Sequence, residues 1–244
     1  MTAMRDVLLE IRARLRSATR VTVVTGAGVS AASGIPTFRG SGGLWRNFRP
    51  EQLATPEAFR RDPRLVWEWY DWRRGLIASC APNPAHEVIA HWSESPGFTL
   101  VTQNVDGLHE RAGTRNVVRY HGSIWTLKCA AACGAPDWND PRVPLQPLPP
   151  HCPACGAVAR PGVVWFGEAI PERVARAAAA ATRCEVFLSI GTSSVVYPAA
   201  ALVAEARSYG AFTVEINPET TGAAVDLAIA APAELVLPRL QNAS

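Results

Sequence analysis

The chain has 244 residues, of which 48% are hydrophobic and 18% are charged, and its formal net charge is +3. This length and apolar content suffice for one well-packed core with a smaller satellite domain. The small positive charge, without a block of lysines and arginines, gives no reason to expect direct nucleic-acid binding. We find neither a secretory signal nor an apolar run long enough to span a bilayer, so we expect a cytoplasmic protein without membrane contact.

The first predicted element is a helix that precedes the first strand. Its arginines are reminiscent of an organelle transit peptide, but Asp6 and Glu10 argue against that interpretation. Apolar residues at helical spacing predict instead that the helix packs against the core, and they are Val7, Leu8, Ile11 and Leu15.

Short apolar segments that alternate with helical patterns predict strands at residues 21–25, 98–102, 117–120, 185–190 and 212–216. This alternation is typical of an α/β fold, with a Rossmann-like parallel sheet and helices on both faces. Ligands of such sheets bind outside the carboxyl ends of the strands. Residues that could bind a ligand or take part in catalysis lie at or near those ends, namely Gly26, Gln103, His121, Gly191 and Asn217.

Two segments interrupt the alternation. One is helical and contains two proline-led helix starts, Thr55-Pro56-Glu57 and Asn83-Pro84. The other is rich in proline and cysteine and has no convincing period. We therefore expect a Rossmann-like domain made of residues 1–35, 93–122 and 162–244, a helical insertion at residues 36–92, and a zinc-binding module at residues 123–161.

Four cysteines of that module form two close pairs, Cys129 with Cys133 and Cys152 with Cys155. Two such pairs about twenty residues apart can supply four thiolates to a tetrahedral zinc ion, which would be structural because no coordination position stays open. Disulfides are the alternative, but a reducing cytoplasm disfavours them. His151 is a conceivable alternative ligand. The isolated residues Cys80 and Cys184 are expected to be small buried hydrophobes.

The turn after the first strand contains Gly26, Ala27 and Gly28. Glycine accepts positive φ and lets a ligand approach the backbone, so this turn predicts a phosphate site. The third glycine of the dinucleotide-binding fingerprint is missing at its usual spacing, and Gly-x-Gly alone is a weak signal.

Several motifs together resemble the sirtuins, the NAD-dependent protein-lysine deacylases. They occur in the family's order: GAGVSAASGIPTFRG at residues 26–40, QNVDG at 103–107, His121-Gly122, the cysteine pairs, and GTS at 191–193. The resemblance implies that NAD and structural zinc are the cofactors and that acylated-lysine proteins are the partners. It also implies that the products are free lysine, nicotinamide and O-acyl-ADP-ribose.

The same resemblance implies the roles of the site residues. Asn104 orders a water or a ribose hydroxyl, Asp106 holds the nicotinamide carboxamide, and His121 is the general base. The cofactor contacts that it implies are Gly26, Ala27 and Gly28 through backbone N–H groups, together with Ser30, Phe38, Arg39, Gln103, Asn104, Asp106, Gly191, Thr192, Ser193, Asn217 and Ala233. Without the family pattern, a histidine at a strand end is more often structural, and an Asn-x-Asp turn is often only a helix cap.

Tyr70 and Arg73 occur at the Tyr-x-x-Arg spacing of the sirtuins that remove succinyl and malonyl groups. On a helix they share one face, and a guanidinium binds a carboxylate through two parallel hydrogen bonds. By the same resemblance Ala54 leaves room for a longer acyl chain, and a substrate strand pairs with the segment that holds Val163, Val164 and Phe166. The alternative is an aromatic packing face with its arginines on the solvent side; its aromatic residues are Trp67, Trp69, Tyr70 and Trp72.

The sequence thus predicts an enzyme that removes succinyl, malonyl and also acetyl groups from protein lysines. Two other functions stay open at this point. A mono-ADP-ribosyltransferase would use NAD but would attach ADP-ribose to protein. A non-catalytic zinc-ribbon protein would bind DNA or a protein partner, although it would have no use for the QNVDG turn with His121.

Overall fold

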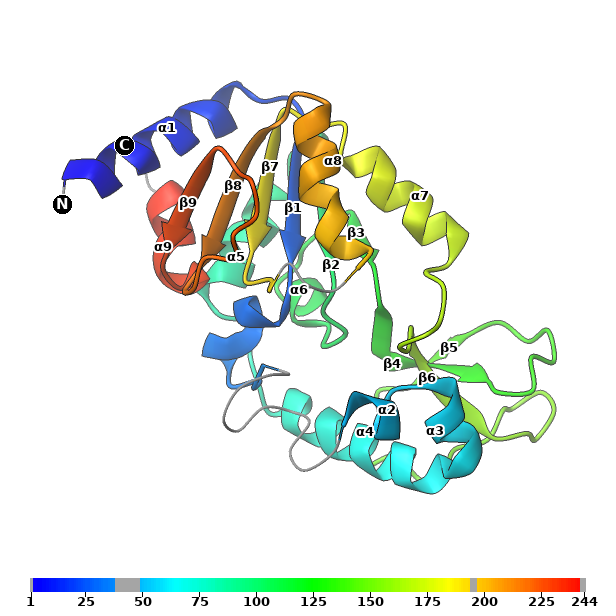
Figure 1. Cartoon of the computed structure of the whole chain (residues 1–244). Coiled ribbons are helices and arrows are strands. Elements are labelled where there is room, and N and C mark those ends of the chain that lie inside the picture. Colours follow the sequence, from blue (N-terminus) through cyan, green and yellow to red (C-terminus); the bar gives the residue numbers. More distant parts are fainter. Residues whose placement is uncertain (1, 38–48, 194–196, 242–244) are drawn as a thin grey trace.

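The computed structural model describes residues 2–37, 49–193 and 197–241. These residues form a larger sheet covered by helices and, beside it, a smaller part made of helices and a second, antiparallel sheet (Figure 1). Of the helices described in these ranges, none combines the length and the apolar character that a membrane crossing requires.

The larger sheet has six strands in the order β3-β2-β1-β7-β8-β9, and every neighbouring pair is parallel. This confirms the predicted fold class. The chain adds β2 and β3 on one side of β1 and then β7, β8 and β9 on the other, so the strand order switches between β1 and β7 (Figure 1). Ligands of such sheets bind at this switch. The strands are β1 (Val21–Thr25), β2 (Phe98–Thr102), β3 (Val117–Arg119), β7 (Val186–Ile190), β8 (Phe212–Asn217) and β9 (Leu227–Ala230).

Helices cover both faces of this sheet, and successive residues of a strand enter different cores. Val23 of β1 packs with α1 (Thr2–Ser17), α5 (Pro84–Trp92) and α9 (Ala233–Gln241). The next residue, Val24, packs with α7 (Glu172–Ala181) and α8 (Leu202–Ser208). Because both faces are covered, the central strand β7 is buried along its whole length, as the strands of a parallel sheet usually are.

The smaller part combines three helices with a three-stranded antiparallel sheet. The helices are α2 (Pro50–Leu53), α3 (Pro56–Arg61) and α4 (Pro63–Ala78), and the strands, in the order β5-β4-β6, are β4 (Gly122–Cys129), β5 (Trp138–Asn139) and β6 (Ala159–Val163). A single core joins the two: Trp67 of α4 is fully buried, and its indole Nε1 donates to the carbonyl of Ala159 over 2.8 Å.

Both predicted helix starts are confirmed. The Thr55 hydroxyl accepts from the Ala58 N–H over 3.1 Å at the start of α3. Asn83 caps α5, where its side chain accepts from the Ala85 N–H and its backbone N–H faces the ring of His86. The remaining described helices are the 3₁₀ segments η1 (Ala27–Ser33) and η2 (Ala199–Ala201) and the short α6 (Leu108–Arg111).

Candidate active site

The carboxyl ends of β1, β2 and β7 meet at one edge of the larger sheet. The Gly26 N–H, just after β1, donates to the carbonyl of Ile190 in β7 over 3.1 Å. Gln103, just after β2, donates from its backbone to the Thr25 carbonyl and from Nε2 to the hydroxyl of Thr192 over 3.1 Å. Three sequence motifs that are far apart in the chain are therefore joined directly.

The glycines of the first turn are required for a reason other than the one expected. Gly26 has φ −125°, and neither it nor Gly28 is among the residues with positive φ. A Cβ on either would lie 2.8 Å from backbone atoms of Gly191, so close packing of the two turns excludes a side chain. The N–H groups of Gly26 and Gly28 already donate to the carbonyls of Ile190 and Gly191. In this structure both groups therefore hold the two turns together, and their contact with a pyrophosphate stays a prediction.

Asn104 and Asp106 meet at the side chain of Ser30 in η1. Asn104 Nδ2 donates to Ser30 Oγ over 3.2 Å and to the Gly26 carbonyl over 3.0 Å. Ser30 Oγ donates to Asp106 Oδ2 over 2.8 Å, and the Leu108 N–H donates to Asp106 Oδ1 over 2.9 Å. Burial raises the pKa of Asp106, although these two donors oppose the shift. The result is an amide and a carboxyl group held in fixed orientations.

Two buried histidines that the sequence analysis did not single out support this cluster. His86 Nδ1 accepts from the Asn83 N–H, which leaves Nε2 protonated and facing Ser30 Oγ at 3.4 Å. His109 Nε2 lies 3.0 Å from Thr25 Oγ1, and the ring centres of His86 and His109 are 4.7 Å apart. Burial lowers the pKa of His86 to about 4 and the pKa of His109 well below its usual value, so both rings are neutral at pH 7. Ser30 and His86 are 56 residues apart, and no spacing rule connects them.

His121 follows β3 and is oriented by one hydrogen bond. Its Nδ1 lies 3.1 Å from the Gln103 carbonyl, and because a carbonyl can only accept, Nδ1 carries the proton. In the neutral ring Nε2 is then the nitrogen that can accept a proton. Burial lowers the pKa of His121, and the bond to Gln103 opposes the shift. This is the protonation state that a general base needs at neutral pH.

Tyr70 and Arg73 lie together on α4, and the two residues are 2% and 4% exposed. Arg73 Cζ lies 4.7 Å from the centre of the Trp69 ring and 5.6 Å from that of Tyr70. Burial lowers the pKa of Arg73, while electrostatic interactions with the nearby Tyr70 and Asp106 oppose the shift. The aromatic residues do pack in a core, as the packing alternative expects. That alternative also expects the arginines on the solvent side, which is wrong, because Arg73 and the adjacent Arg74 are both buried.

The segment with Val163, Val164 and Phe166 runs between His121 and Ala54. The Val164 N–H donates to the His121 carbonyl over 2.9 Å, and the Phe166 N–H donates to the Ala54 carbonyl over 3.0 Å. Val163 ends β6, whereas the side chain of Phe166 is half exposed. A substrate strand would have to pair with backbone groups other than these two N–H donors.

The remaining predicted cofactor residues surround the same end of the sheet. Thr192 is buried and Ser193 is exposed, both after β7; Asn217 ends β8, and Ala233 begins α9. Phe38 and Arg39 lie outside the described residues.

The four predicted zinc ligands are gathered at one point. Their sulfur atoms all lie within 4.8 Å of one another, with Cys129 to Cys155 at 3.6 Å and Cys133 to Cys152 at 3.8 Å. A tetrahedral zinc with Zn–S bonds of about 2.3 Å separates its sulfurs by about 3.8 Å. All four are free thiols, not disulfides. Hydrogen bonds within the cluster, the largest of them from the Cys133 N–H, lower the pKa of Cys129 to about 6, whereas the pKa of the coupled Cys155 is raised, so the thiolate forms first at Cys129. Within the described residues this metal-ligand cluster contains no histidine, so His151 is not one of its members.

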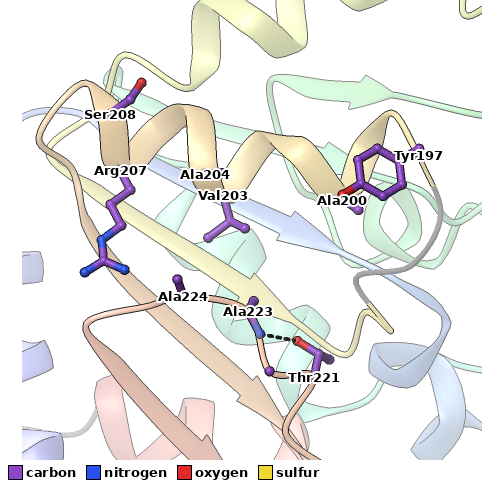
Figure 2. A pocket seen from close by; sticks show the side chains of 10 residues that line it. Tyr197, Ala200, Val203, Ala204, Arg207, Ser208, Thr221, Ala223 and Ala224 are labelled. Atoms are coloured by element: carbon purple, nitrogen blue, oxygen red, sulfur yellow. Dashed lines mark hydrogen bonds between the residues drawn. The ribbon is translucent and has the colours of Figure 1, made fainter.

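A separate cavity of about 510 Å³ lies between α8 and the loop after β8 (Figure 2). Val203 and Arg207 line it from the helix, and Thr221 and Ala223, which are hydrogen-bonded to each other, line it from the loop. It contains none of the predicted site residues.

The chain is similar to known proteins over most of its length. The family model described as the Sir2 family matches residues 26–198. A protein of Aquifex aeolicus named NAD-dependent protein deacylase is 52% identical over 203 residues, which cover 82% of this chain and 84% of that protein. NAD-dependent protein deacylase 1 of Pseudomonas aeruginosa is 50% identical over 236 residues, which cover 93% of this chain and 94% of that protein.

Solved structures agree with these matches. A structure described as a Sir2 homolog–NAD complex has a TM-score of 0.89 and 41% identity, and covers 95% of this chain and 91% of its own. The family model spans well over half of the chain, and relatives about half identical match nearly its full length. The resemblance to the sirtuins is therefore confirmed: the chain belongs to the Sir2 family.

Proposed function

We propose that this protein is an NAD-dependent protein-lysine deacylase. The curated relatives that are about half identical carry this name. The observation that supports it most is the hydrogen bond between His121 Nδ1 and the Gln103 carbonyl, because it leaves Nε2 as the base and anchors the ring to the residue before Asn104, whose side chain is fixed with that of Asp106.

NAD would supply the ADP-ribose that receives the acyl group and the nicotinamide that leaves. Asp106 would hold the nicotinamide carboxamide, and Asn104 would order a water or a ribose hydroxyl. His121 Nε2 would take the proton of a ribose hydroxyl and so act as the general base. The neutral His86, through Ser30, would keep the Asp106 carboxyl group in place without adding a positive charge.

The rest of the NAD molecule would lie along the carboxyl ends of the strands, where the two glycine turns pack against each other. Thr192 and Ser193 would contact phosphate and ribose, and Asn217 and Ala233 the adenosine end. We keep Ala27, Phe38 and Arg39 as further contacts on the strength of the resemblance alone.

Zinc fits the four-thiolate cluster and would leave no coordination position open for a substrate. Strand β4 begins at Gly122, next to His121, and ends at Cys129. Eight strand residues extend over about 25 Å, so the metal would act on the fold and not on the chemistry.

We further propose that acidic acyl groups, succinyl and malonyl, are preferred over acetyl. The support is that Tyr70 and Arg73 bring a phenol and a guanidinium together on α4. The Arg73 guanidinium also interacts electrostatically with the carboxyl group of Asp106. A guanidinium in such low-dielectric surroundings gains much more from a carboxylate partner than one in water does.

The test is a set of matched peptides that differ only in the acetyl, malonyl or succinyl group on one lysine, each assayed with and without NAD. We expect deacylation only with NAD, and a higher kcat/KM for the two acidic groups. Deacylation without NAD would contradict the first proposal. Acetyl as the best substrate would contradict the second proposal and leave the first intact.

A further inference from the structure

Trp165 and Tyr70 share a hydrogen bond inside the smaller core. Trp165 Nε1 lies 2.9 Å from the Tyr70 hydroxyl oxygen, and the two residues are 3% and 2% exposed. They come from different parts of the chain, because Tyr70 is on α4 and Trp165 follows β6.

The direction of this bond follows from the chemistry of the two groups. An indole N–H can only donate, so the Tyr70 oxygen is the acceptor. The hydroxyl proton must then point along another direction around that oxygen. Among the residues that the structure describes, no acceptor for this proton is found, whereas the nearby Arg73 offers only donors. The site would therefore present an O–H donor and a guanidinium together.

Trp165 is itself held firmly. Its backbone N–H donates to Glu168 Oε2 over 2.8 Å, and the Arg160 guanidinium stacks on its ring with Cζ 3.5 Å from the centre. Arg160 is paired with Glu168, and the ring of Phe59 lies 5.2 Å from the ring of Trp165. The indole thus has little freedom to turn its N–H away from Tyr70.

We propose that Trp165 is a positioning residue for acyl selectivity: its indole N–H fixes the Tyr70 hydroxyl so that the phenol donates to the carboxylate of a succinyl or malonyl group. This inference rests on the acidic-acyl preference proposed above. Burial raises the pKa of Tyr70, so the phenol keeps the proton that it must donate. An acetyl group has no such carboxylate and would gain nothing from the arrangement.

The test replaces Trp165 by phenylalanine, which keeps an aromatic ring and removes the N–H. The readout is the ratio of kcat/KM for succinyl and acetyl peptides, which cancels general damage to folding or NAD binding. We expect the ratio to fall about five-fold, as for the loss of one neutral hydrogen bond. Trp67→Phe is the matched control, since it removes another buried indole N–H of this core, one that donates to the Ala159 carbonyl, and should leave the ratio unchanged.

A double-mutant cycle with Tyr70→Phe identifies the path of the effect. If Trp165 acts through the phenol, Trp165→Phe will not change the ratio further once the Tyr70 hydroxyl is absent. Should Trp165→Phe prevent folding, benzothienylalanine at position 165 keeps the shape of the indole without its N–H, and the same ratio is measured.

The outcomes separate this inference from the function on which it rests. A wild-type enzyme that prefers succinyl, combined with an unchanged ratio in the position-165 variants, overturns the role of Trp165 alone. An equal fall in the Tyr70→Phe background also overturns it, because the effect then bypasses the phenol. A wild-type enzyme without any preference for acidic groups overturns both.

Discussion

His121 is placed so that its backbone and its ring serve different parts of the site. The ring donates from Nδ1 to the Gln103 carbonyl, while the backbone carbonyl accepts from the Val164 N–H. The first contact orients the base, and the second joins it to the segment proposed to bind the substrate. A change in the ring alone should therefore affect chemistry more than architecture.

Replacing His121 by alanine should lower kcat for deacylation by at least about 100-fold, because general-base catalysis contributes on the order of 10²- to 10⁴-fold. NAD affinity, measured by calorimetry, and the thermal unfolding midpoint should change little. Turnover close to that of the wild type would contradict the assignment of the base.

The acidic limb of the pH profile tests the same residue in the intact enzyme. Burial lowers the pKa of His121, so the ring stays neutral, and able to accept a proton, to a lower pH than an exposed histidine would. A profile of kcat/KM against pH should therefore lose activity only below the usual histidine pKa of about 6.5. A limb well above that value would indicate a different titrating group.

Arg73 carries the proposed acyl preference. In Arg73→Met a succinyl carboxylate would lack its charged partner, and such a loss typically costs about 2–5 kcal/mol, or roughly 30- to several-thousand-fold in kcat/KM. Deacetylation should fall far less. Tyr70→Phe should give a milder loss of the same sign, about ten-fold.

The neighbouring Arg74 provides the control for this change. Its guanidinium is fully buried and donates to the carbonyls of Ile124 and Arg142. Arg74→Met should therefore reduce stability and lower both activities together. If Arg73→Met also lowers desuccinylation and deacetylation by the same factor, Arg73 is structural and the acidic-acyl preference fails.

At the scale of elements, β4 connects the zinc cluster to the candidate active site. The strand starts beside His121 and ends at Cys129, and β6 returns antiparallel to it toward Val163. Because β4 and β6 share a core with α4, loss of the metal should loosen the support of Tyr70 and Trp165.

Cys152→Ser should therefore lower the zinc content, the thermal unfolding midpoint and the activity together. Elemental analysis of the purified protein should find one zinc per chain, and chelation should reproduce the effect of the mutation. Full activity after complete removal of the metal would contradict a structural role.

Across the whole molecule, the elements that were predicted best from the sequence are those that depend on a local pattern of apolar residues. The strands at residues 21–25 and 98–102 have the predicted bounds because each is a continuous apolar run between clear ends. β9 and the two-residue β5 were not predicted, since so few residues carry no usable period. β4 and β6 were not predicted either, because their sequences, GSIWTLKC and ARPGV, lack a regular alternation of apolar and polar residues.

The motifs also predicted the residues that meet at the sheet edge and the four gathered cysteines. They did not predict how the residues are held, because the contacts from His86 to Ser30 and from Trp165 to Tyr70 depend on tertiary packing. The close packing that requires the glycines was not predicted for the same reason: the close neighbour Gly191 is remote in sequence and is brought to Gly26 and Gly28 only by folding.

The most direct test of the proposed activity is mass spectrometry of the products formed from NAD and an acyl-lysine peptide. We expect one nicotinamide, one free-lysine peptide and one O-acyl-ADP-ribose for each NAD consumed. Release of nicotinamide with ADP-ribose attached to protein and the acyl group still on the peptide would contradict it, and would identify a mono-ADP-ribosyltransferase instead.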